Sequence, residues 1–471
     1  MLSRIALFSG FIYLSVFSLN SVASETPHYR VSVASNLTDI QIEACFKNTI
    51  PQRLEADDTA ALYIRSMQVK DGGEISVEGH LAATEYLKPD SCVEYRVSLN
   101  PRTKGEQRGG PETRYVNADA LLTNIGDWLW RPVGPDGPIA FELEFEHSQD
   151  VFIGAPWEKS NDVSYLVPAT PTQWQGVVTF SSKAPIPIEA PSANLELSIL
   201  GEFENLTTEQ IAEWIGTSAN AAATITGSFP VQRAQVVVSA IQRGKGVIPW
   251  AYVSRGGGPG IHLFVNESAT ADQLSRDWST PHEMLHLLLP NIASGDHWIV
   301  EGLPSYYQYI AMARGQVITP ENAWSKLIEN LVEGERREEE FSVAEATLKA
   351  GRRGIYKKIY WGGAAYFFRL DVAIRIASKN QQSLDSVLMQ FRDCCFDFKS
   401  DYSGEWILEE LDRISGTDLF TTERDLQIEQ RKFPNYLEPF DLLTIEFLGG
   451  HPYSVNPDLS PIRTSIMGKD I

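Results

Sequence analysis

Alternating hydrophobic and polar residues dominate the chain up to about residue 195. Stretches such as "HYRVSVAS", "CVEYRVSL" and "IAFELEFEH" place apolar side chains at nearly every second position, and Gly, Pro, Asp or Asn separate the stretches. A period of two is typical of strands that bury one face. The pattern therefore predicts a β-rich N-terminal domain over residues 25–195, built as a β-sandwich or as two small β units.

The pattern changes after the proline-rich segment 183–194, "KAPIPIEAPSAN", which we interpret as a domain boundary. A Thr-x-x-Gln signature at Thr207 or Thr208 predicts the start of a helix. The runs "AQVVVSAIQ", "IPWAYVSR" and "GIHLFVN" predict three strands. Apolar residues then recur with a helical period, which predicts helices over 281–289, 298–313, 320–333, 343–350, 361–378, 383–392 and 403–413. The fold class is thus α+β multidomain, with a small sheet and a mainly helical body over 196–440 and a C-terminal tail over 441–471.

The N-terminal segment 1–24 has the pattern of a secretory signal peptide. Arg4 precedes an apolar run over residues 5–17, and small residues follow, so we expect cleavage after Ala23 or Ser24. The apolar run is too short for a comfortable membrane span, and no later run reaches roughly 20 apolar residues. We therefore expect an exported protein, periplasmic or secreted, without a stable membrane span.

Export permits disulfides, and the chain has four cysteines. Cys45 and Cys92 both lie in strand-like sequence, and we favour a bridge between them. Cys394 and Cys395 are adjacent, where a bridge is strained, so buried free thiols are at least as plausible there.

The size of the chain indicates how many domains it has, and its charge excludes some classes of partner. A chain of 471 residues is too long to fold around one hydrophobic core, which favours two or three domains. The formal net charge of −21 argues against nucleic acid or an anionic membrane as a partner, because little would neutralise phosphates.

The segment "STPHEMLH" carries the clearest chemistry. His282 and His286 are four residues apart, so on a helix both imidazoles face the same side and can bind one metal ion. Neutral imidazoles suit catalytic Zn²⁺, and Glu283 would lie next to the zinc-activated water as a general base. A chance match in this composition arises on the order of 1% of the time.

A purely structural interpretation of the same segment is a capped core helix. Thr280 would be its N-cap, Pro281 its first residue, and Glu283 would complete a capping box. That interpretation leaves His282 and His286 unexplained, since histidine is a mediocre helix former and costly to bury unpaired.

A third ligand would complete a catalytic zinc site. Asp296 and His297 are candidates in the loop that follows. Glu301 is favoured, because it is an acidic residue in the otherwise apolar helix "HWIVEGLPSYYQYIAM" and buried charges are normally paired or metal-bound. A carboxylate placed near the positive end of a helix dipole is the structural alternative.

"HEMLH" followed by "WIVEGLPSYY" resembles the gluzincin zinc metallopeptidases, closest to the glycyl aminopeptidase family often found with PDZ domains. "YRVSVAS", "FPVQRAQVVVSAI" and "IYWGGAAYFFRLDVAIR" extend the resemblance over about residues 28–435. It implies a β-sandwich followed by a thermolysin-like catalytic domain. No PDZ-sized segment follows residue 440.

The resemblance also implies residue roles. His282, His286 and Glu301 would bind Zn²⁺, and Glu283 would be the general base. Tyr360, in "Tyr-Trp-Gly-Gly-Ala", would stabilise the oxyanion. Tyr356, one helical turn earlier, is the competing candidate.

The glycine-rich segment "RGGGPGIHLFVNES" departs from the family pattern. Aminopeptidase relatives carry an acidic residue there that holds the substrate's amino group, but no acidic residue precedes Glu267 here. We expect Gly257, Gly258 and Gly260 to contact a peptide laid along the strand edge. Pro304 also falls inside the predicted helix that carries Glu301, where it would bend the helix or free a carbonyl.

These observations predict an exported zinc-dependent peptidase that acts on a peptide or protein. The alternative is a non-catalytic protein of gluzincin fold that serves as a peptide-binding or envelope scaffold. Turnover of peptides would distinguish the two, because a scaffold retains peptides without cutting them.

Overall fold

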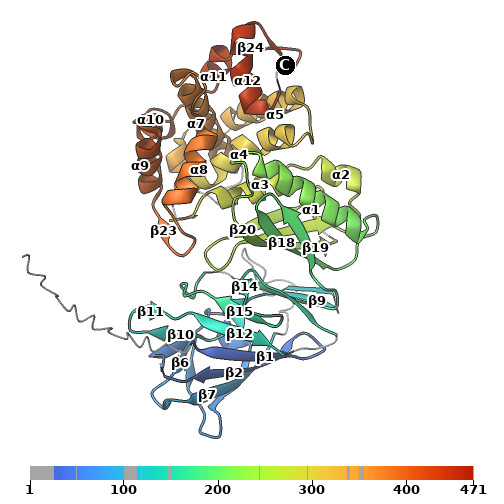
Figure 1. The fold of residues 1–471 in the computed structure, drawn as a ribbon, viewed down its shortest axis with the longest axis vertical. Helices are drawn as coiled ribbons and strands as arrows, with labels where there is room; N and C mark the ends of the chain where they lie inside the picture. Colours follow the sequence, from blue (N-terminus) through green and yellow to red (C-terminus); the bar gives the residue numbers. More distant parts are fainter. Residues whose placement is uncertain are drawn as a thin grey trace, which may run out of the picture.

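The computed structural model describes residues 26–469, apart from residues 49, 100–113, 118, 147–149, 175, 243, 294, 337–339 and 350–354. The expected signal peptide, residues 1–24, lies outside the described residues. The described chain forms two domains, β-rich sheets followed by a mainly helical region (Figure 1). This arrangement confirms the predicted α+β fold class.

Three sheets build the N-terminal domain. The first has the order β14-β15-β12-β1-β2-β7-β4, formed by β1 (His28–Val33), β2 (Asp39–Phe46), β4 (Ile64–Val69), β7 (Ser91–Ser98), β12 (Phe141–Phe145), β14 (Glu158–Lys159) and β15 (Ser164–Val167). The second has the order β11-β10-β3-β6-β5, formed by β3 (Arg53–Glu55), β5 (Val77–Glu78), β6 (Leu81–Ala83), β10 (Arg131–Gly134) and β11 (Gly137–Pro138). The third has the order β13-β16-β9-β8, formed by β8 (Arg114–Asn117), β9 (Ala120–Asn124), β13 (Phe152–Gly154) and β16 (Val177–Ser181).

One hydrophobic core joins these sheets. Strand β2, "DIQIEACF", buries every second residue, as its alternating sequence predicts. Aromatic side chains fill the space between the sheets, with Tyr95 packed edge-on against Trp130 and Trp128 against Phe180. The alternating apolar residues of β2 therefore form the face of the strand that is buried in this core.

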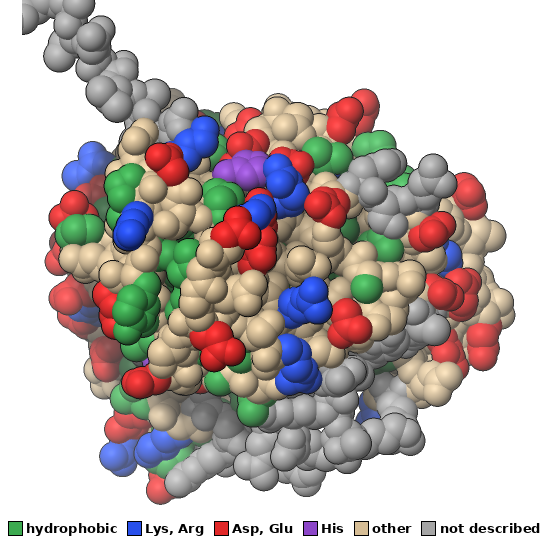
Figure 2. Space-filling model, turned by 90° about the horizontal axis from the view of Figure 1, so that it is seen from below, with side chains coloured by type: hydrophobic (Ala, Val, Ile, Leu, Met, Phe, Trp, Pro, Cys, Tyr) green, Lys and Arg blue, Asp and Glu red, His purple; other side chains and the backbone are tan. Residues whose placement is uncertain are grey.

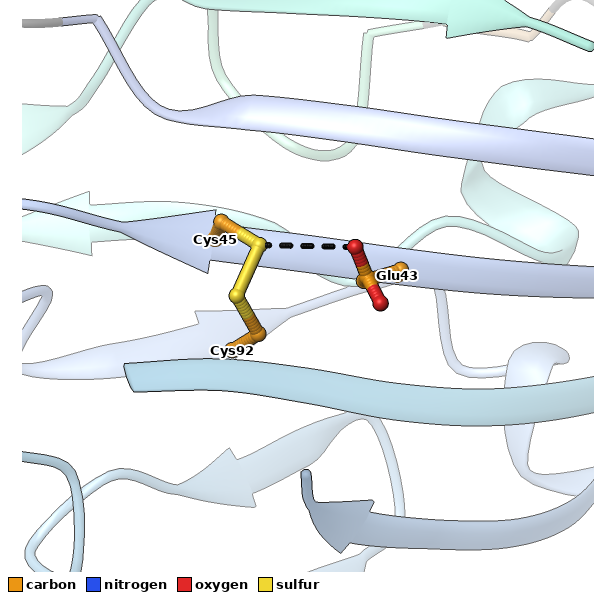
Figure 3. A group of neighbouring side chains, drawn as sticks. All are labelled: Glu43, Cys45 and Cys92. Carbon is orange, nitrogen blue, oxygen red and sulfur yellow. Dashed lines mark hydrogen bonds between the residues drawn. A yellow bond between two sulfur atoms is a disulfide. The ribbon is translucent and has the colours of Figure 1, made fainter. Parts of the chain in front are cut away.

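The disulfide between Cys45 and Cys92 is present, and it links two residues that pair directly across β2 and β7 (Figure 3). Glu43 lies beside it, with a carboxylate oxygen 3.8 Å from the Cys45 sulfur. These three residues lie close enough together to suggest a metal site. Because the two sulfurs are bonded to each other, neither offers the thiolate that a metal would need.

Cys394 and Cys395 are bonded to each other as well. Cys394 ends helix α8 (Leu384–Cys394) and is exposed, while Cys395 is half-buried. The expectation of buried free thiols is therefore wrong. The helix ends here, so Cys394 lies at the surface, while Cys395 packs against the edge of the hydrophobic core.

A five-stranded sheet begins the second domain and has the order β17-β18-β19-β21-β20. Its strands are β17 (Ile186–Ala190), β18 (Ala193–Leu200), β19 (Arg233–Ile241), β20 (Trp250–Ser254) and β21 (Gly260–Asn266). Strands β18, β19 and β21 are parallel, and β20 is an antiparallel edge strand. A boundary at residue 195 falls inside β18, whereas the strand pairing changes from one domain's sheets to the other's between β16 and β17.

Helices form most of the rest of this domain, on the side of the sheet away from the N-terminal domain (Figure 1). They are α1 (Thr208–Ala223), α2 (Ala271–Ser275), α3 (Ser279–Leu285), α4 (His297–Arg314), α5 (Pro320–Glu335), α6 (Val343–Leu348), α7 (Tyr356–Ala377), α8, α9 (Gly404–Ser415), α10 (Leu419–Glu423), α11 (Leu437–Leu442) and α12 (Ser460–Met467). The capping signature at Thr207 is confirmed. The backbone N–H of Gln210 donates to the Thr207 hydroxyl, and the backbone N–H of Thr207 donates to the side-chain oxygen of Gln210. Helix α7 begins five residues before the predicted start at 361.

The C-terminal residues 441–469 fold against the helical body. They form the hairpin of β24 (Ile445–Leu448) and β25 (His451–Ser454), followed by α12. Arg314 of α4 donates to the carbonyls of Ser465 and Ile466, and Ile466 is buried. Among the described residues, no helix is long and apolar enough to cross a membrane.

Figure 2 shows the end of the molecule formed by the N-terminal domain. On the described side chains of this face, Lys and Arg are interspersed with Asp and Glu and do not gather into one basic surface. That this face carries no basic surface on its described side chains agrees with the strongly acidic composition of the chain.

Candidate active site

Helix α3 positions the two histidines. It begins at Ser279, after Trp278, which makes no side-chain capping bond. The expectation of Thr280 as N-cap and Pro281 as first residue is therefore wrong. Pro281 lies within the first turn, where backbone amides have no helical acceptor, so its missing N–H costs nothing there. Glu283 therefore does not complete a capping box with Thr280, and capping does not explain why it is there.

His282, His286 and Glu301 converge, and we call them the ligand cluster. Glu301 Oε2 lies 3.3 Å from Nε2 of His282 and 3.5 Å from Nε2 of His286. Bonds of about 2.0–2.2 Å in a tetrahedral site put ligand atoms about 3.3 Å apart. One ligand atom from each residue lies within 4.8 Å of the others. The donor set and its spacing therefore fit a zinc ion with an open fourth position.

The crossing of α4 and α7 brings Glu301 to the histidines. Gly302 and Gly363 meet at this crossing, where a Cβ on Gly363 would lie 2.2 Å from the Trp298 carbonyl oxygen and one on Gly302 2.5 Å from the Gly363 Cα. Only glycine permits backbones to approach so closely. Glu301 precedes Gly302 directly and Tyr360 precedes Gly363 by three residues, so the contact sets the position of both side chains.

Gln308 orients the first histidine. Its Oε1 lies 2.9 Å from Nδ1 of His282, so the imidazole can donate its Nδ1–H there and leave Nε2 free for a metal. Gln308 follows Glu301 by seven residues, two turns along α4, and is buried. It is a polar residue in an apolar helix, the same signal that identified Glu301, but the sequence analysis missed it.

Pro304 lies inside α4 without ending the helix. A proline has no N–H, so the Val300 carbonyl one turn earlier lacks its usual helical donor. This carbonyl has a weak electrostatic influence on His286, whose Nδ1 has no hydrogen-bond partner among the described residues. Burial lowers the pKa of His286 to about 3, while Glu301 and, more weakly, the Val300 carbonyl oppose that shift. The second histidine is therefore neutral at physiological pH, which is the form that binds a metal.

Glu283 lies next to the ligand cluster, with a carboxylate oxygen 3.9 Å from Nε2 of His286. Burial raises the pKa of Glu283 to about 7, with Glu301 adding to the shift and His282 and Arg255 opposing it. A carboxylate poised near neutral pH is suited to accept and return a proton.

Glu301 is an ionised ligand in the same site. Although burial acts to raise its pKa, His286, His282 and a hydrogen bond from Tyr360 hold it at about 2. The structure thus places Tyr360 at the cluster, with its ring parallel to that of His282 at 5.9 Å. Burial and the nearby carboxylates raise the pKa of the Tyr360 phenol, so it remains a hydrogen-bond donor. Tyr356 is 49% exposed, which leaves Tyr360 as the better-placed tyrosine.

The other two candidate ligands lie elsewhere. Asp296 accepts a hydrogen bond from the Gly404 amide at 3.0 Å and so ties the loop before α4 to the start of α9. His297 is exposed at the start of α4. Neither belongs to the ligand cluster.

Arg255 is a charged residue of the site that the sequence analysis did not identify. It follows β20, and its Nε donates to the backbone carbonyl of His286 at 3.1 Å. Burial lowers the pKa of Arg255 to about 10, against the opposing influence of Glu301 and Glu283, so the guanidinium stays charged at neutral pH. The signal in the sequence was an arginine at the end of an otherwise uncharged strand.

The three glycines predicted to contact substrate are buried. The Gly257 carbonyl accepts a hydrogen bond of 2.8 Å from Trp157 in the N-terminal domain. Gly258 has a φ of +124° and packs against Pro156, while Gly260 lies in β21. Gly257 and Gly258 therefore contact the N-terminal domain, and a role in binding substrate remains a prediction.

Solved structures with a similar fold include an aminopeptidase N family protein and M1 zinc metallopeptidases. An aminopeptidase N family protein from Idiomarina loihiensis superposes with a TM-score of 0.68 at 13% sequence identity, over 89% of this chain and 78% of that one. An M1 zinc metallopeptidase from Deinococcus radiodurans, a mutant bound to a Tyr-Ser-Ala substrate, has a TM-score of 0.53 at 13% identity, over 87% and 96% of the two chains. A two-domain M1 zinc metallopeptidase mutant bound to L-arginine has a TM-score of 0.55 at 13% identity, over 88% and 96%.

No family model matches the sequence, and no curated protein matches it either. At 13% identity the structural likeness shows the fold alone. The chain is thus similar in fold to the M1 aminopeptidase N family of zinc metallopeptidases, which are gluzincins. Its ligand cluster resembles the His-Glu-x-x-His and distant Glu pattern of such enzymes.

Proposed function

We propose that this protein is an exported zinc-dependent peptidase that hydrolyses peptide bonds. The observation that carries the proposal is the convergence of His282, His286 and Glu301 at zinc-ligand spacing, with Glu283 beside them. The two-domain metallopeptidase fold supports it, as does the peptide bound by one protein of similar fold. Export rests on the sequence of residues 1–24.

The ligand cluster would hold the metal, and zinc would supply a Lewis acid that acidifies water and polarises a carbonyl. Glu283 accepts the proton of the attacking water and returns it to the leaving amine. The Tyr360 hydroxyl donates a hydrogen bond to the oxyanion that develops on the substrate carbonyl. Gln308 holds His282 in the orientation that presents Nε2.

The finer assignment is a peptidase whose metal site resembles that of the glycyl aminopeptidases. Its support is the run of Trp298, Glu301, Gly302 and "SYY" in α4, together with Tyr360 in α7. The glycine segment lacks the acidic residue by which such relatives hold a free amine. We therefore propose cleavage of peptides without a requirement for a free N-terminus.

Substitution of the base tests the proposal most directly. Glu283→Gln should keep stoichiometric zinc and lose about 10²–10⁴-fold in kcat on a peptide library, because the amide cannot accept the proton. His286→Ala should lose both zinc and turnover, because one of three protein ligands is gone. Metal analysis and mass spectrometry of the digested library measure the two effects.

The matched control is Glu209→Gln, which removes an exposed carboxylate from the first turn of α1. It should leave turnover unchanged. Zinc binding without cleavage by the parent protein would reject the enzyme and favour the scaffold alternative. Equal turnover by Glu283→Gln and the parent would reject Glu283 as the base.

A further inference from the structure

The guanidinium of Arg255 is a positive charge without a protein counter-ion. In the part of the chain that the structure describes, it forms no ion pair with Asp or Glu, and its hydrogen bond is the one to the His286 carbonyl. That bond uses Nε and fixes the plane of the guanidinium against the end of α3. The two Nη groups therefore remain for another partner.

The two acidic groups of the site do not neutralise Arg255. Glu301 Oε2 lies against the imidazoles of His282 and His286, and Glu283 lies beside His286. Both carboxylates influence Arg255 through space, but neither contacts it. Arg255 is partly buried, and unpaired Nη groups on a partly desolvated cation favour an anion from outside the chain.

A cavity is present where such an anion would lie. Its volume is about 250 Å³, and Arg255 lines it together with Ser254, Trp174, Asn291 and Asp401. The walls come from both domains, with Trp174 from the N-terminal domain and Asn291 from the segment after α3. The cavity thus adjoins the end of the helix that carries both histidines. Asp401 is its one acidic lining residue, and it is exposed.

We propose that Arg255 binds a carboxylate of the peptide substrate in this cavity. The inference deepens the proposed peptidase function and rests on it. A planar guanidinium matches a carboxylate well, and within a peptide the available carboxylates are an acidic side chain and the free C-terminus. The enzyme therefore favours peptides that carry one of these groups close to the cleaved bond.

Matched peptides test this preference. One pair carries Glu or Gln next to the cleaved bond, with both termini blocked; a second pair has a free or an amidated C-terminus one residue beyond it. For at least one pair, the parent should show a kcat/KM at least 10-fold higher for the carboxylate form, mainly through KM. Arg255→Gln should bring the ratio of kcat/KM between the carboxylate peptide and its matched partner close to one. The peptide pair that loses its preference shows whether the carboxylate is an acidic side chain or the free C-terminus.

Two further variants control the experiment. Arg255→Lys keeps the charge without the planar fork and should retain part of the preference; it also serves if Arg255→Gln does not fold. Arg276→Gln removes an exposed arginine of the α2 C-terminus that pairs with Asp272, and it should retain the full ratio. A parent that cleaves both members of each pair equally, or an unchanged ratio in folded Arg255→Gln, overturns the proposal.

Binding separates this inference from the proposed function. Calorimetry with the same peptides on zinc-loaded Glu283→Gln measures recognition without cleavage. If the parent never cleaves but Glu283→Gln binds the carboxylate peptide at least 10-fold more tightly in an Arg255-dependent way, the anion site stands and the peptidase proposal fails. If cleavage occurs without any carboxylate preference in binding or turnover, the anion site fails alone.

Discussion

Gln308 is the residue on which the orientation of His282 depends. Replacing it with Leu removes the acceptor 2.9 Å from Nδ1 and leaves a buried N–H without a partner. Loss of such a partner typically costs 10–100-fold in metal affinity. We therefore expect Gln308→Leu to bind zinc about 10–100-fold more weakly than the parent, as measured by competition with a chromogenic chelator.

The conservative variant Gln308→Glu retains an acceptor at the same place and should restore most of the affinity. A purely structural role would leave zinc affinity unchanged in both variants once they are folded. Unchanged affinity in Gln308→Leu would therefore contradict the orienting role of this side chain.

At the scale of elements, the contact between α4 and α7 determines the geometry of the site. Gly363→Ala would place a methyl group 2.2 Å from the Trp298 carbonyl oxygen and push the helices apart. Overpacking of this kind costs about 1–3 kcal/mol, and Glu301 would move away from the histidines. We expect a lower free energy of unfolding together with weaker zinc binding, measured by denaturant titration and chelator competition.

Gly216 in the interior of α1 provides the matched control. A Cβ there would meet its nearest neighbour, Ile188 Cγ2, at 3.7 Å, an ordinary contact. Gly216→Ala should therefore stabilise the protein by about 0.5–1 kcal/mol and leave zinc affinity unchanged. If both glycine variants behaved alike, close approach at the α4–α7 crossing would not be the cause.

At the scale of the whole molecule, the two domains are joined by a hydrogen bond from Trp157 to the glycine segment. Trp157 is buried, and its Nε1 donates to the Gly257 carbonyl across the domain interface. Trp157→Phe keeps an aromatic ring but leaves that carbonyl unsatisfied, at a cost of about 1–3 kcal/mol. We expect a lower Tm and faster proteolysis between β16 and β17, measured by calorimetry and limited digestion.

Trp214 serves as the control for that substitution. It is also buried, but its Nε1 has no hydrogen-bond partner among the described residues. Trp214→Phe therefore loses packing without breaking a hydrogen bond and should not speed cleavage between the domains. Similar proteolysis of both variants would show that the Trp157 bond does not hold the interface.

The sequence by itself determined most of the elements and the residues that could hold a metal ion. A period of two predicted strands, a period near 3.6 predicted helices, and spacing of four predicted that His282 and His286 share a helix face. These are local properties, because each depends on residues within one or two turns. An acidic residue in an apolar helix was also enough to favour Glu301, since a buried charge needs a partner.

Only the tertiary structure decided which residues meet across elements. Tyr356 and Tyr360 lie one turn apart on the same face of α7, so the helical period does not distinguish them. In the structure Tyr360 lies at the ligand cluster, three residues before the Gly302–Gly363 contact, whereas Tyr356 is the first residue of α7 and is exposed. Arg255, which directly follows β20, contacts the carbonyl of His286, 31 residues later in the chain. Contacts at such separations depend on how helices and sheets pack, and no local period encodes them.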